Sequence, residues 1–460
     1  MPEFGAQARS SVRRLRTRGL DPLVVISAVL VLLTGGFAAL TFAHPGSGRV
    51  QSPRNVTFSA ALRGCPATAS GSSIRVGSLG SGTAGILTRQ GNAPATQAGI
   101  VRPTQTTDIP ADGQQQSVTV GGPAAAGIAV GAFGTNPLAG TRCLEPTSDY
   151  WFTGLGAAST HDSIIEINNP ADTQAEVVIT RYSSRTAAAP VLDDRVLAPH
   201  SNLSIDLFKD SPQYGVFAID ASVVQGQASV AVLDQAQTPG QAALSDWLVP
   251  QDKPLNTVTL LGVPQAARQT LTVANPSGAQ ITATIQLITK NSTFAPPKLA
   301  GITVPGTGVV TADLSSILAG AKDVVGIEID APTAITASLA SIVGNDLAIT
   351  GADPLLTAEG GTVLPDGNKT VVIGAAAVAG SVNVIARDAS GHVIFRRSVA
   401  VTPSGAASVN VPATTSLIQI QTNKISLRAA VLVSGTGAVV VPMGRVIRVS
   451  SVPYVRPGVG

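Results

Sequence analysis

The chain has 460 residues, of which 44% are hydrophobic, 12% charged and 3% aromatic, and its formal net charge is +3. Residues 1–43 contain five arginines against Glu3 and Asp21, a balance of +3, so the remaining residues sum to zero. A neutral chain lacks the basic surface with which proteins bind nucleic acid, and one of this length can form several hydrophobic cores.

The first predicted element is a membrane anchor. Residues Leu23–Ala43 contain no charged side chain, and as a helix rising about 1.5 Å per residue they would span about 30 Å, the hydrocarbon thickness of a bilayer. The arginines that precede them predict that this flank stays in the cytoplasm. We therefore expect a cytoplasmic segment (1–21), a single-pass plasma-membrane anchor (22–44) and an extracytoplasmic remainder. The alternative is a signal peptide cleaved after Ala43.

Two cysteines, Cys65 and Cys143, follow the predicted anchor. In an oxidising compartment such a pair most simply forms one disulfide bond. The alternative is two buried free thiols. Two cysteines without nearby histidines are too few ligands for a structural metal site, and we predict no metal.

Beyond Ser52 the sequence predicts strands. Short segments rich in β-branched residues alternate with clusters of Gly, Pro, Asn and Asp, and many of them alternate apolar with polar residues. Helical signals are confined to Ser315–Ala319 and Lys209–Tyr214. We therefore predict an all-β ectodomain.

Internal repeats divide this region. Asn169-Pro170 recurs as Asn275-Pro276, an offset of 106 residues, and the strands around each turn recur in the same order. A weaker copy runs from Thr370 to Val433, and the region before residue 147 forms a degenerate copy with the two cysteines. Units near 100 residues are typical of β-sandwich (Ig-like) domains, and a β-propeller is the competing architecture. The predicted β units are 55–146, 147–245, 246–354 and 355–450, followed by a tail at 451–460.

Three stretches resemble a recurring pattern of one protein family. Cys143–Phe152, Ile164–Pro170 and Ala175–Thr180 place a Cys before a Trp, then a strand that ends in Asn-Pro, then a strand rich in Val and Thr. In this the chain is similar to an actinobacterial family of N-terminally anchored envelope proteins that is catalogued only as a domain of unknown function. Its members tend to be encoded beside large membrane glycosyltransferases, which implies a cell-envelope glycan context. The resemblance implies no catalytic residues.

The sequence offers little that predicts catalysis. Gly80, Gly82 and Gly85 form a G-x-G-x-x-G string, but no helical pattern follows it, as a dinucleotide site requires. The four histidines lack a nucleophile motif, and the doublet Asp193-Asp194 lies at a strand start. Further aspartates recur in successive units, which favours strand-end hydrogen bonds over a catalytic site: Asp206, Asp220, Asp313 and Asp330. We therefore expect neither an enzyme nor a cofactor.

Aromatic residues supply the candidate binding site. Tyr150 and Trp151 begin the second unit, and Trp247 stands at the matching start of the next. Tryptophans at equivalent positions favour core packing, whereas exposed ones would form a platform for a partner or a cell-wall glycan. We expect a non-enzymatic, membrane-tethered scaffold that binds envelope proteins, among them a membrane glycosyltransferase. The alternatives are a glycan-binding module and an unrecognised envelope hydrolase.

Overall fold

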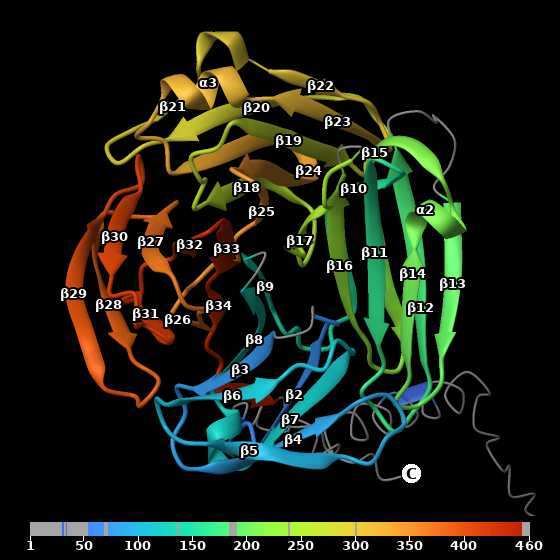
Figure 1. Cartoon of the computed structure of the whole chain (residues 1–460), viewed down its shortest axis with the longest axis vertical. Coiled ribbons are helices and arrows are strands. Elements are labelled where there is room, and N and C mark those ends of the chain that lie inside the picture. The colour runs from blue at the N-terminus through green and yellow to red at the C-terminus, as the bar shows by residue number, and fades with distance from the viewer. Residues whose placement is uncertain are drawn as a thin grey trace, which may run out of the picture. The chain divides into compact units, whose positions relative to one another are not determined.

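The protein is all-β, as the strand patterns predict (Figure 1). The computed structural model describes residues 30, 31, 34, 54–68, 72–135, 138–183, 191–237, 240–299 and 301–452. Contacts divide the chain into two compact units, one of residues Val56–Ser450 and a smaller one that combines Met1–Asn55 with Ser451–Gly460. Strand β1 (Arg54–Thr57) pairs with β35 (Val449–Val452) in a two-stranded sheet.

The predicted anchor at residues 22–44 falls mostly outside the described residues, as do its cleavage alternative after Ala43 and most of the tail at 451–460. Leu30, Val31 and Thr34 are helical, and the Thr34 hydroxyl donates a hydrogen bond to the Leu30 carbonyl at 2.8 Å. Among the residues that the structure describes, no helix is both long and apolar enough to cross a membrane.

Within Val56–Ser450 one strand order recurs four times, in segments that we call the first to fourth repeats. The first, coloured blue to teal in Figure 1, contains β2 (Ala60–Cys65), β3 (Ser73–Ser78), β4 (Ala84–Arg89), β5 (Thr96–Val101), β6 (Thr106–Pro110), β7 (Gln116–Gly121), η1 (Pro123–Ala125), β8 (Ile128–Thr135) and β9 (Leu138–Arg142). The second contains β10 (Asp149–Ala158), β11 (His161–Asn168), β12 (Ala175–Ser183), β13 (Val191–Leu197), β14 (Asn202–Asp206), α2 (Leu207–Asp210), β15 (Gln213–Gln225), β16 (Ser229–Ala236) and β17 (Leu244–Leu248).

The two later repeats keep this order. The third contains β18 (Leu255–Leu261), β19 (Arg268–Asn275), β20 (Ile281–Ile288), β21 (Thr293–Phe294), η2 (Pro297–Leu299), β22 (Ile302–Val304), β23 (Gly308–Asp313), α3 (Ser315–Gly320), β24 (Gly326–Val343) and β25 (Asp346–Gly351). The fourth contains β26 (Glu359–Val363), β27 (Asn368–Gly374), β28 (Gly380–Arg387), β29 (Val393–Val401), β30 (Ala407–Val411), β31 (Leu417–Gln421), β32 (Arg428–Ser434) and β33 (Ala438–Pro442), and β34 (Gly444–Arg445) then pairs with β26.

Each repeat builds two sheets from this order. In the first repeat the sheets run β2-β7-β4-β5 and β6-β3-β8-β9, and in the fourth β26-β31-β28-β29 and β30-β27-β32-β33, the same positions in the same order. The second repeat joins its two sheets through the β10–β11 hairpin, and in the third the long strand β24 serves both sheets. The predicted degenerate first copy therefore has the complete topology of the others.

The two sheets of a repeat enclose one hydrophobic core. In β4, Ala84, Ile86 and Thr88 are buried while Gly85 and Leu87 are exposed, the alternation of a strand with one face toward a core. Similar apolar clusters fill each of the other repeats. Burial of alternate side chains supplies the main favourable term in folding such sheets.

The Asn-Pro turns have the same hydrogen bonds in the second and third repeats. The Asn169 side chain accepts the Ala171 N–H at 3.1 Å and donates to the Thr173 and Ala198 carbonyls at 2.8 and 2.9 Å. Asn275 accepts the Ser277 N–H at 3.0 Å and donates to the carbonyls of Ala279 and Pro305 at 2.8 and 3.0 Å. Each buried asparagine thus ties its turn to the loop before β14 or β23, and these contacts satisfy its buried polar atoms.

Two boundaries differ from those predicted. Strand β17 pairs with β16 of the second repeat, so this repeat extends through Leu248 rather than ending at residue 245, and Trp247 belongs to it. Trp151 pairs in register with Asp220, and the equivalent pair in the third repeat is Thr257 with Asp330. The two tryptophans therefore do not occupy equivalent positions. The predicted helical stretch at 209–214 begins earlier, at 207, and ends at 210.

The last strands of the four repeats contact one another in a closed series, β9 with β17, β17 with β25, β25 with β33, and β33 with β9. Buried aspartates bridge these strands. The Asp246 carboxylate accepts the N–H groups of Gly140 at 3.4 Å and Ile349 at 2.9 Å, and Asp346 accepts the Ala438 N–H at 3.0 Å. Burial raises the pKa of Asp246 well above its usual range and that of Asp346 to about 6.

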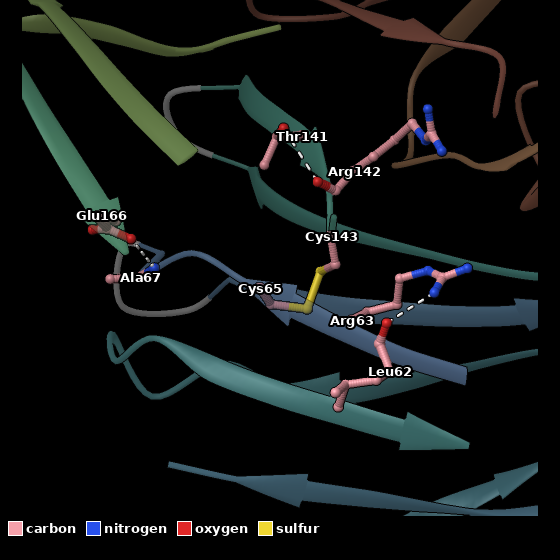
Figure 2. The surroundings of a disulfide bond; sticks show 8 residues. All are labelled: Leu62, Arg63, Cys65, Ala67, Thr141, Arg142, Cys143 and Glu166. Carbon is pink, nitrogen blue, oxygen red and sulfur yellow. Dashed lines mark hydrogen bonds between the residues drawn. A yellow bond between two sulfur atoms is a disulfide. The ribbon is translucent and has the colours of Figure 1, made fainter. Parts of the chain in front are cut away.

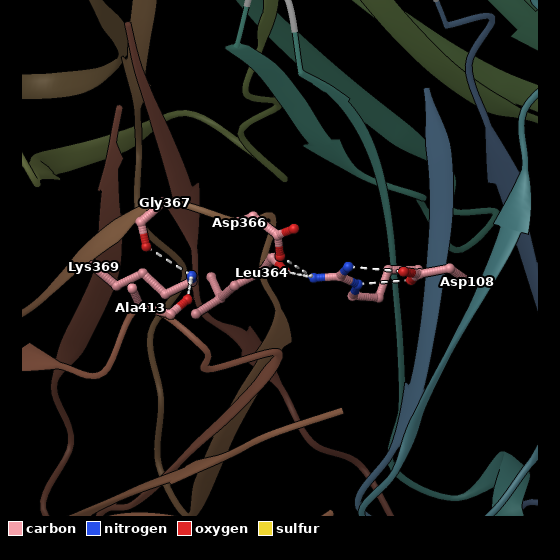
Figure 3. Close-up of polar contacts among 7 residues, drawn as sticks. Asp108, Leu364, Asp366, Gly367, Lys369 and Ala413 are labelled. Atoms are coloured by element: carbon pink, nitrogen blue, oxygen red, sulfur yellow. Dashed lines mark hydrogen bonds and ion pairs between the residues drawn. The ribbon is translucent and has the colours of Figure 1, made fainter. Parts of the chain in front are cut away.

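Arg75 connects the first repeat to the fourth, whereas Lys369 forms its hydrogen bonds within the fourth repeat. Figure 3 shows the polar contacts of this region. Arg75 in β3 pairs with Asp108 at 2.7 Å and donates to the Leu364 carbonyl, which follows β26. The Lys369 ammonium donates to the Gly367 carbonyl at 2.9 Å and to the Ala413 carbonyl, and burial lowers its pKa to about 8. Hydrogen bonds to two carbonyls give this lysine a structural role.

Candidate functional site

The predicted disulfide between Cys65 and Cys143 is present (Figure 2). Cys65 ends β2 and Cys143 follows β9, and their Cα atoms are 4.4 Å apart with an Sγ–Sγ distance of 2.00 Å. Both residues are buried in the core of the first repeat. The bond therefore joins the first strand of this repeat to the end of its last, across a sequence separation of 78 residues.

Two arginines flank this disulfide and extend in the same direction from their strands (Figure 2). Arg63 lies in β2 and Arg142 at the end of β9. The Arg63 guanidinium donates to the Leu62 carbonyl at 2.8 Å and pairs with Glu145 at 3.3 Å. Burial lowers the pKa of Arg63, and the negative charge of Glu145 opposes this effect. Arg63 is thus held in place by partners in the first repeat and in the link that follows it.

Arg142 has a different environment. Its guanidinium has no hydrogen-bond or ion-pair partner among the described residues, and it is partly buried. It lies flat against the backbone of β34, because a Cβ atom built on Gly444 would be 2.4 Å from its Nη2 atom. Burial and, next, the positive charge of Arg63 lower the pKa of Arg142 to about 10. Its charge is therefore uncompensated by direct contacts.

A third arginine adjoins this pair. Arg445 follows Gly444 in β34, and its guanidinium lies 3.3 Å from the carboxylate of Asp252, in the link between the second and third repeats. Asp252 and Glu145 are largely exposed, with side-chain accessibilities of 71% and 63%. Three guanidinium groups therefore share the region with two solvated carboxylates, which leaves an excess of positive charge.

A pocket of about 240 Å³ opens beside Arg63 and Arg445, and Arg142 is not one of its lining residues. Arg63, Arg445 and Glu145 supply its charged lining, and Phe58, Ile447 and Ala60 are among its apolar lining residues. Guanidinium groups bind carboxylate and phosphate oxygens through paired N–H donors, and the apolar wall suits the body of a small ligand. The arrangement can bind and orient an anion.

The predicted aromatic contact residues have unequal exposure. Tyr150 and Trp247 are buried, with accessibilities of 2% and 4%, while Trp151 is partly exposed and its ring centroid lies 5.4 Å from that of Tyr182. The Tyr150 hydroxyl donates to the Glu145 carbonyl at 2.8 Å, and burial raises its pKa. This burial favours a packing role for Tyr150 and Trp247, and of the three predicted contact residues it leaves Trp151 with surface available to a partner.

One histidine belongs to a buried polar cluster. His161 Nε2 lies 3.0 and 3.1 Å from the two carboxylate oxygens of Asp234, and the Ser163 hydroxyl donates to the same carboxylate at 2.6 Å. In a catalytic triad the histidine stands between the serine and the acid, whereas here the aspartate stands between the other two. The Ser163 hydroxyl therefore donates to the carboxylate and not to the histidine, and the cluster links β11 to β16.

The other singled-out residues make local contacts. His200 pairs with Asp172 at 2.6 Å and His392 with Asp388 at 3.3 Å. The glycine string Gly80, Gly82 and Gly85 runs from a loop into β4, so a strand follows it where a dinucleotide site needs a helix. Among the described residues, no three His, Cys, Asp or Glu side chains are grouped so that they could hold a metal ion.

The recurring aspartates hold chain turns and strands. Asp206 accepts the Lys209 N–H at 3.0 Å at the start of α2, and Asp313 accepts the Ser315 N–H at 2.9 Å before α3. Asp330 accepts from the Thr257 hydroxyl at 2.7 Å, which links strands β24 and β18. Their recurrence therefore reflects the repeated architecture.

The arginine cluster was not predicted. Arg142 lies 79 residues after Arg63 and 303 residues before Arg445, so no local spacing connects the three. An arginine one or two residues before each cysteine was the available signal, since a disulfide between Cys65 and Cys143 brings Arg63 and Arg142 together.

Comparison with known proteins places the chain in a family. A model described as "Family of unknown function (DUF5719)" matches residues 108–412, and no curated protein matches the chain. Two solved structures show weak likeness. One is entitled "Crystal Structure of Thermotoga maritima 1070", with 14% identity over 24% of this chain and 98% of that chain and a TM-score of 0.21.

The other solved structure is a "tetra-tandem repeat in extending region of large adhesion protein", with 14% identity over 84% of this chain and 98% of that chain and a TM-score of 0.11. At these TM-scores neither structure supports an inference about fold or function. The family match covers more than half of the chain and agrees with the predicted resemblance to a domain of unknown function. The protein belongs to the family of unknown function DUF5719.

Proposed function

We propose that the protein is a non-enzymatic scaffold of the bacterial cell envelope, anchored by one N-terminal transmembrane helix and binding envelope proteins, among them a membrane glycosyltransferase. The observation that carries this proposal is the closed series of contacts among the four repeats. Backbone N–H groups of one repeat bond to buried carboxylates of another, as at Asp246 and Asp346. Such contacts make a rigid support, because buried polar groups hold one arrangement when they are fully paired.

The extracytoplasmic location is supported by the disulfide and by the sequence of the anchor. Disulfides persist in oxidising compartments and are rare in the cytoplasm. The apolar run Leu23–Ala43 with its preceding arginines has the length and charge asymmetry of a single-pass anchor with a cytoplasmic N-terminus. Tethering by such a helix raises the concentration of a bound partner near the bilayer.

The repeats have the character of β-sandwich domains, since each encloses one core between two sheets. Their outer strands offer places for partners to bind. In the described part of the chain, β29 pairs with β28 alone, so its other edge has free backbone donors and acceptors. Val393, Arg396 and Arg397 on this strand are exposed. Extended segments of other proteins can add a strand to such an edge.

Capture of partners from native membranes tests the proposal. The full-length tagged protein is crosslinked in cells and purified, and captured envelope proteins are compared with those of the Arg396→Glu/Arg397→Glu variant, whose edge has opposite charge. Arg268→Glu, a change on another strand, is the matched control. We expect enrichment of envelope proteins with wild type and with the control, and a weaker set with the edge variant. Recovery of no envelope protein with wild type would contradict the scaffold function.

Two further measurements test the tether. The intact mass of the purified protein shows whether the chain retains residues 1–43. Protease added to intact spheroplasts should digest the bulk of the chain from outside. A mature chain that begins after Ala43, or protection of the bulk from protease, would contradict the anchored topology.

A further inference from the structure

We propose that Arg63, Arg142 and Arg445 form a binding site for a small oxyanion, a carboxylate or phosphate carried by a group about the size of one sugar residue. The site lies where the first repeat meets the links that lead to its neighbours. It does not rest on the scaffold function, because its evidence is the charge and geometry of these side chains. Its test is a direct titration, so its failure is separate from a failure to capture partner proteins.

The first argument is the charge balance. Arg63 is paired with Glu145 at 3.3 Å and Arg445 with Asp252 at 3.3 Å, whereas the Arg142 guanidinium has no partner within the described chain. Partial burial disfavours a cation without a direct partner, and repulsion from Arg63 and Arg445 adds to this cost, while attraction from Asp252 and Glu145 offsets part of it. A bound anion offsets both effects.

The second argument is the position of the guanidinium donors. The Arg142 guanidinium lies against the Gly444 backbone, where any side chain would displace it, since a Cβ there would be 2.4 Å from Nη2. Arg63 is held by its bond to the Leu62 carbonyl at 2.8 Å. A donor held as Arg63 is binds an oxyanion with little further loss of side-chain entropy. Two planar forks on one side also match the oxygen geometry of carboxylates and phosphates.

The third argument is the size and lining of the adjoining pocket. Its volume of about 240 Å³ is below the roughly 300–1,000 Å³ of sites for drug-sized ligands. It therefore fits one acidic group with a short attached body. Phe58 and Ile447 in its lining supply apolar contact for that body, while Arg63 and Arg445 supply charge.

Glu145 and Asp252 do not fill the role of the anion. Both carboxylates are already paired with other arginines, and both side chains are mostly exposed to water. A solvated carboxylate contributes little to such a pair. The region therefore keeps a net positive charge that these two residues leave unmatched.

Isothermal titration of the full-length protein tests the site with four probes: inorganic phosphate, glucose 1-phosphate, glucuronate and uncharged glucose. We expect saturable binding of the three anions and none of glucose. Tighter binding of glucuronate would identify a carboxylate sugar as the ligand class, and tighter binding of glucose 1-phosphate a sugar phosphate. Equal binding of inorganic phosphate and glucose 1-phosphate would assign the site to free phosphate.

Arg142→Met should weaken anion binding at least tenfold, and Arg142→Lys should weaken it less because the charge remains without the fork. Arg396→Met, an exposed arginine of β29, is the matched control and should bind as wild type does. We also expect Arg142→Met to raise Tm by about 1–3 °C, since it removes an uncompensated charge.

Gly444→Ala provides a second variant that keeps every charge but displaces the Arg142 guanidinium. It should weaken binding as Arg142→Met does, while Gly435→Ala, at a glycine with open space around it, should not. The proposal is overturned if wild type binds no anion, if glucose binds as well as glucuronate, or if Arg142→Met binds as wild type does. A fall in Tm for Arg142→Met would also overturn it, because it would show a structural role for the guanidinium.

Discussion

Removal of the disulfide should loosen the first repeat selectively. In the Cys65→Ala/Cys143→Ala variant, the cross-link between residues 78 positions apart is lost. The chain-entropy relation for a loop of about 80 residues gives roughly 4.5 kcal/mol of stabilisation at 25 °C. The two alanines leave only small voids, since each substitution removes one sulfur atom. We therefore expect the first repeat to lose about 4 kcal/mol in its free energy of unfolding.

Hydrogen exchange read by mass spectrometry measures this effect repeat by repeat. Peptides from β2–β9 (Ala60–Arg142) should exchange faster in the variant, while peptides from the third repeat should change little. Neighbouring repeats will reduce the effect, because the Ala67 N–H donates to Glu166 at 2.7 Å and holds the first repeat to the second. Reduced wild type should behave as the variant does, and the variant should be insensitive to reductant.

Equal protection of β2–β9 in the wild type and the variant would refute this reasoning. It would mean that contacts with the neighbouring repeats, and not the cross-link, determine the stability of the first repeat. Uniform loss of protection in all four repeats would show instead that they unfold as one cooperative unit.

Three further predictions concern contacts within and between repeats. Burial raises the pKa of Asp353 to about 8, so the folded protein favours its neutral form. Stability should therefore fall as pH rises from about 4 to 8, by up to about 1.4 kcal/mol per pH unit. In urea titrations Asp353→Asn, whose amide oxygen can still accept the Leu261 N–H, should flatten this decline, whereas the exposed control Asp193→Asn should not. An unchanged slope would contradict the assignment to Asp353. Asn169→Ala and Asn275→Ala should each lower the free energy of unfolding by about 1–3 kcal/mol in chemical denaturation, because each leaves buried backbone groups without partners. A loss no larger than that of the exposed control Asn291→Ala would contradict the equivalence of the two turns. Gly64→Ala should lower Tm, since the new Cβ would lie 1.7 Å from the Ser229 hydroxyl oxygen. Adding Ser229→Gly to this variant should partly restore Tm. Additive effects of the two substitutions in this double-mutant cycle would count against the close contact.

Polar residues join the repeats of a chain that has few aromatic residues. Aromatic side chains are 3% of the chain, so the cores consist mainly of Val, Ile, Leu and Ala. Asp246 and Asp346 add hydrogen bonds where the last strands of the repeats meet. Since burial raises the pKa of Asp246 well above its usual range, this carboxyl group favours its neutral form and avoids most of the cost of a buried charge.

Local patterns in the sequence were enough to predict the strands, the repeats and the disulfide. Alternating side chains identify a half-buried strand because residues two apart lie on one face, and β4 shows this alternation in its burial. The Asn-Pro turns were recognisable because proline cannot donate in a ladder, and the matching contacts of Asn169 and Asn275 confirm their equivalence. The strands and turns depend on residues close together in the chain, and the disulfide follows from the presence of only two cysteines.

The tertiary structure alone decided which strands ended a repeat and which side chains met. The assignment of Trp247 to the second repeat depends on the pairing of β17 with β16, and the contact of β33 with β9 joins segments about 300 residues apart. The same holds for Arg142, which meets Arg63 through a disulfide and Gly444 through packing. Periodicity records only which face of a strand is buried, whereas these contacts depend on how separate sheets pack, and no spacing in the sequence encodes that.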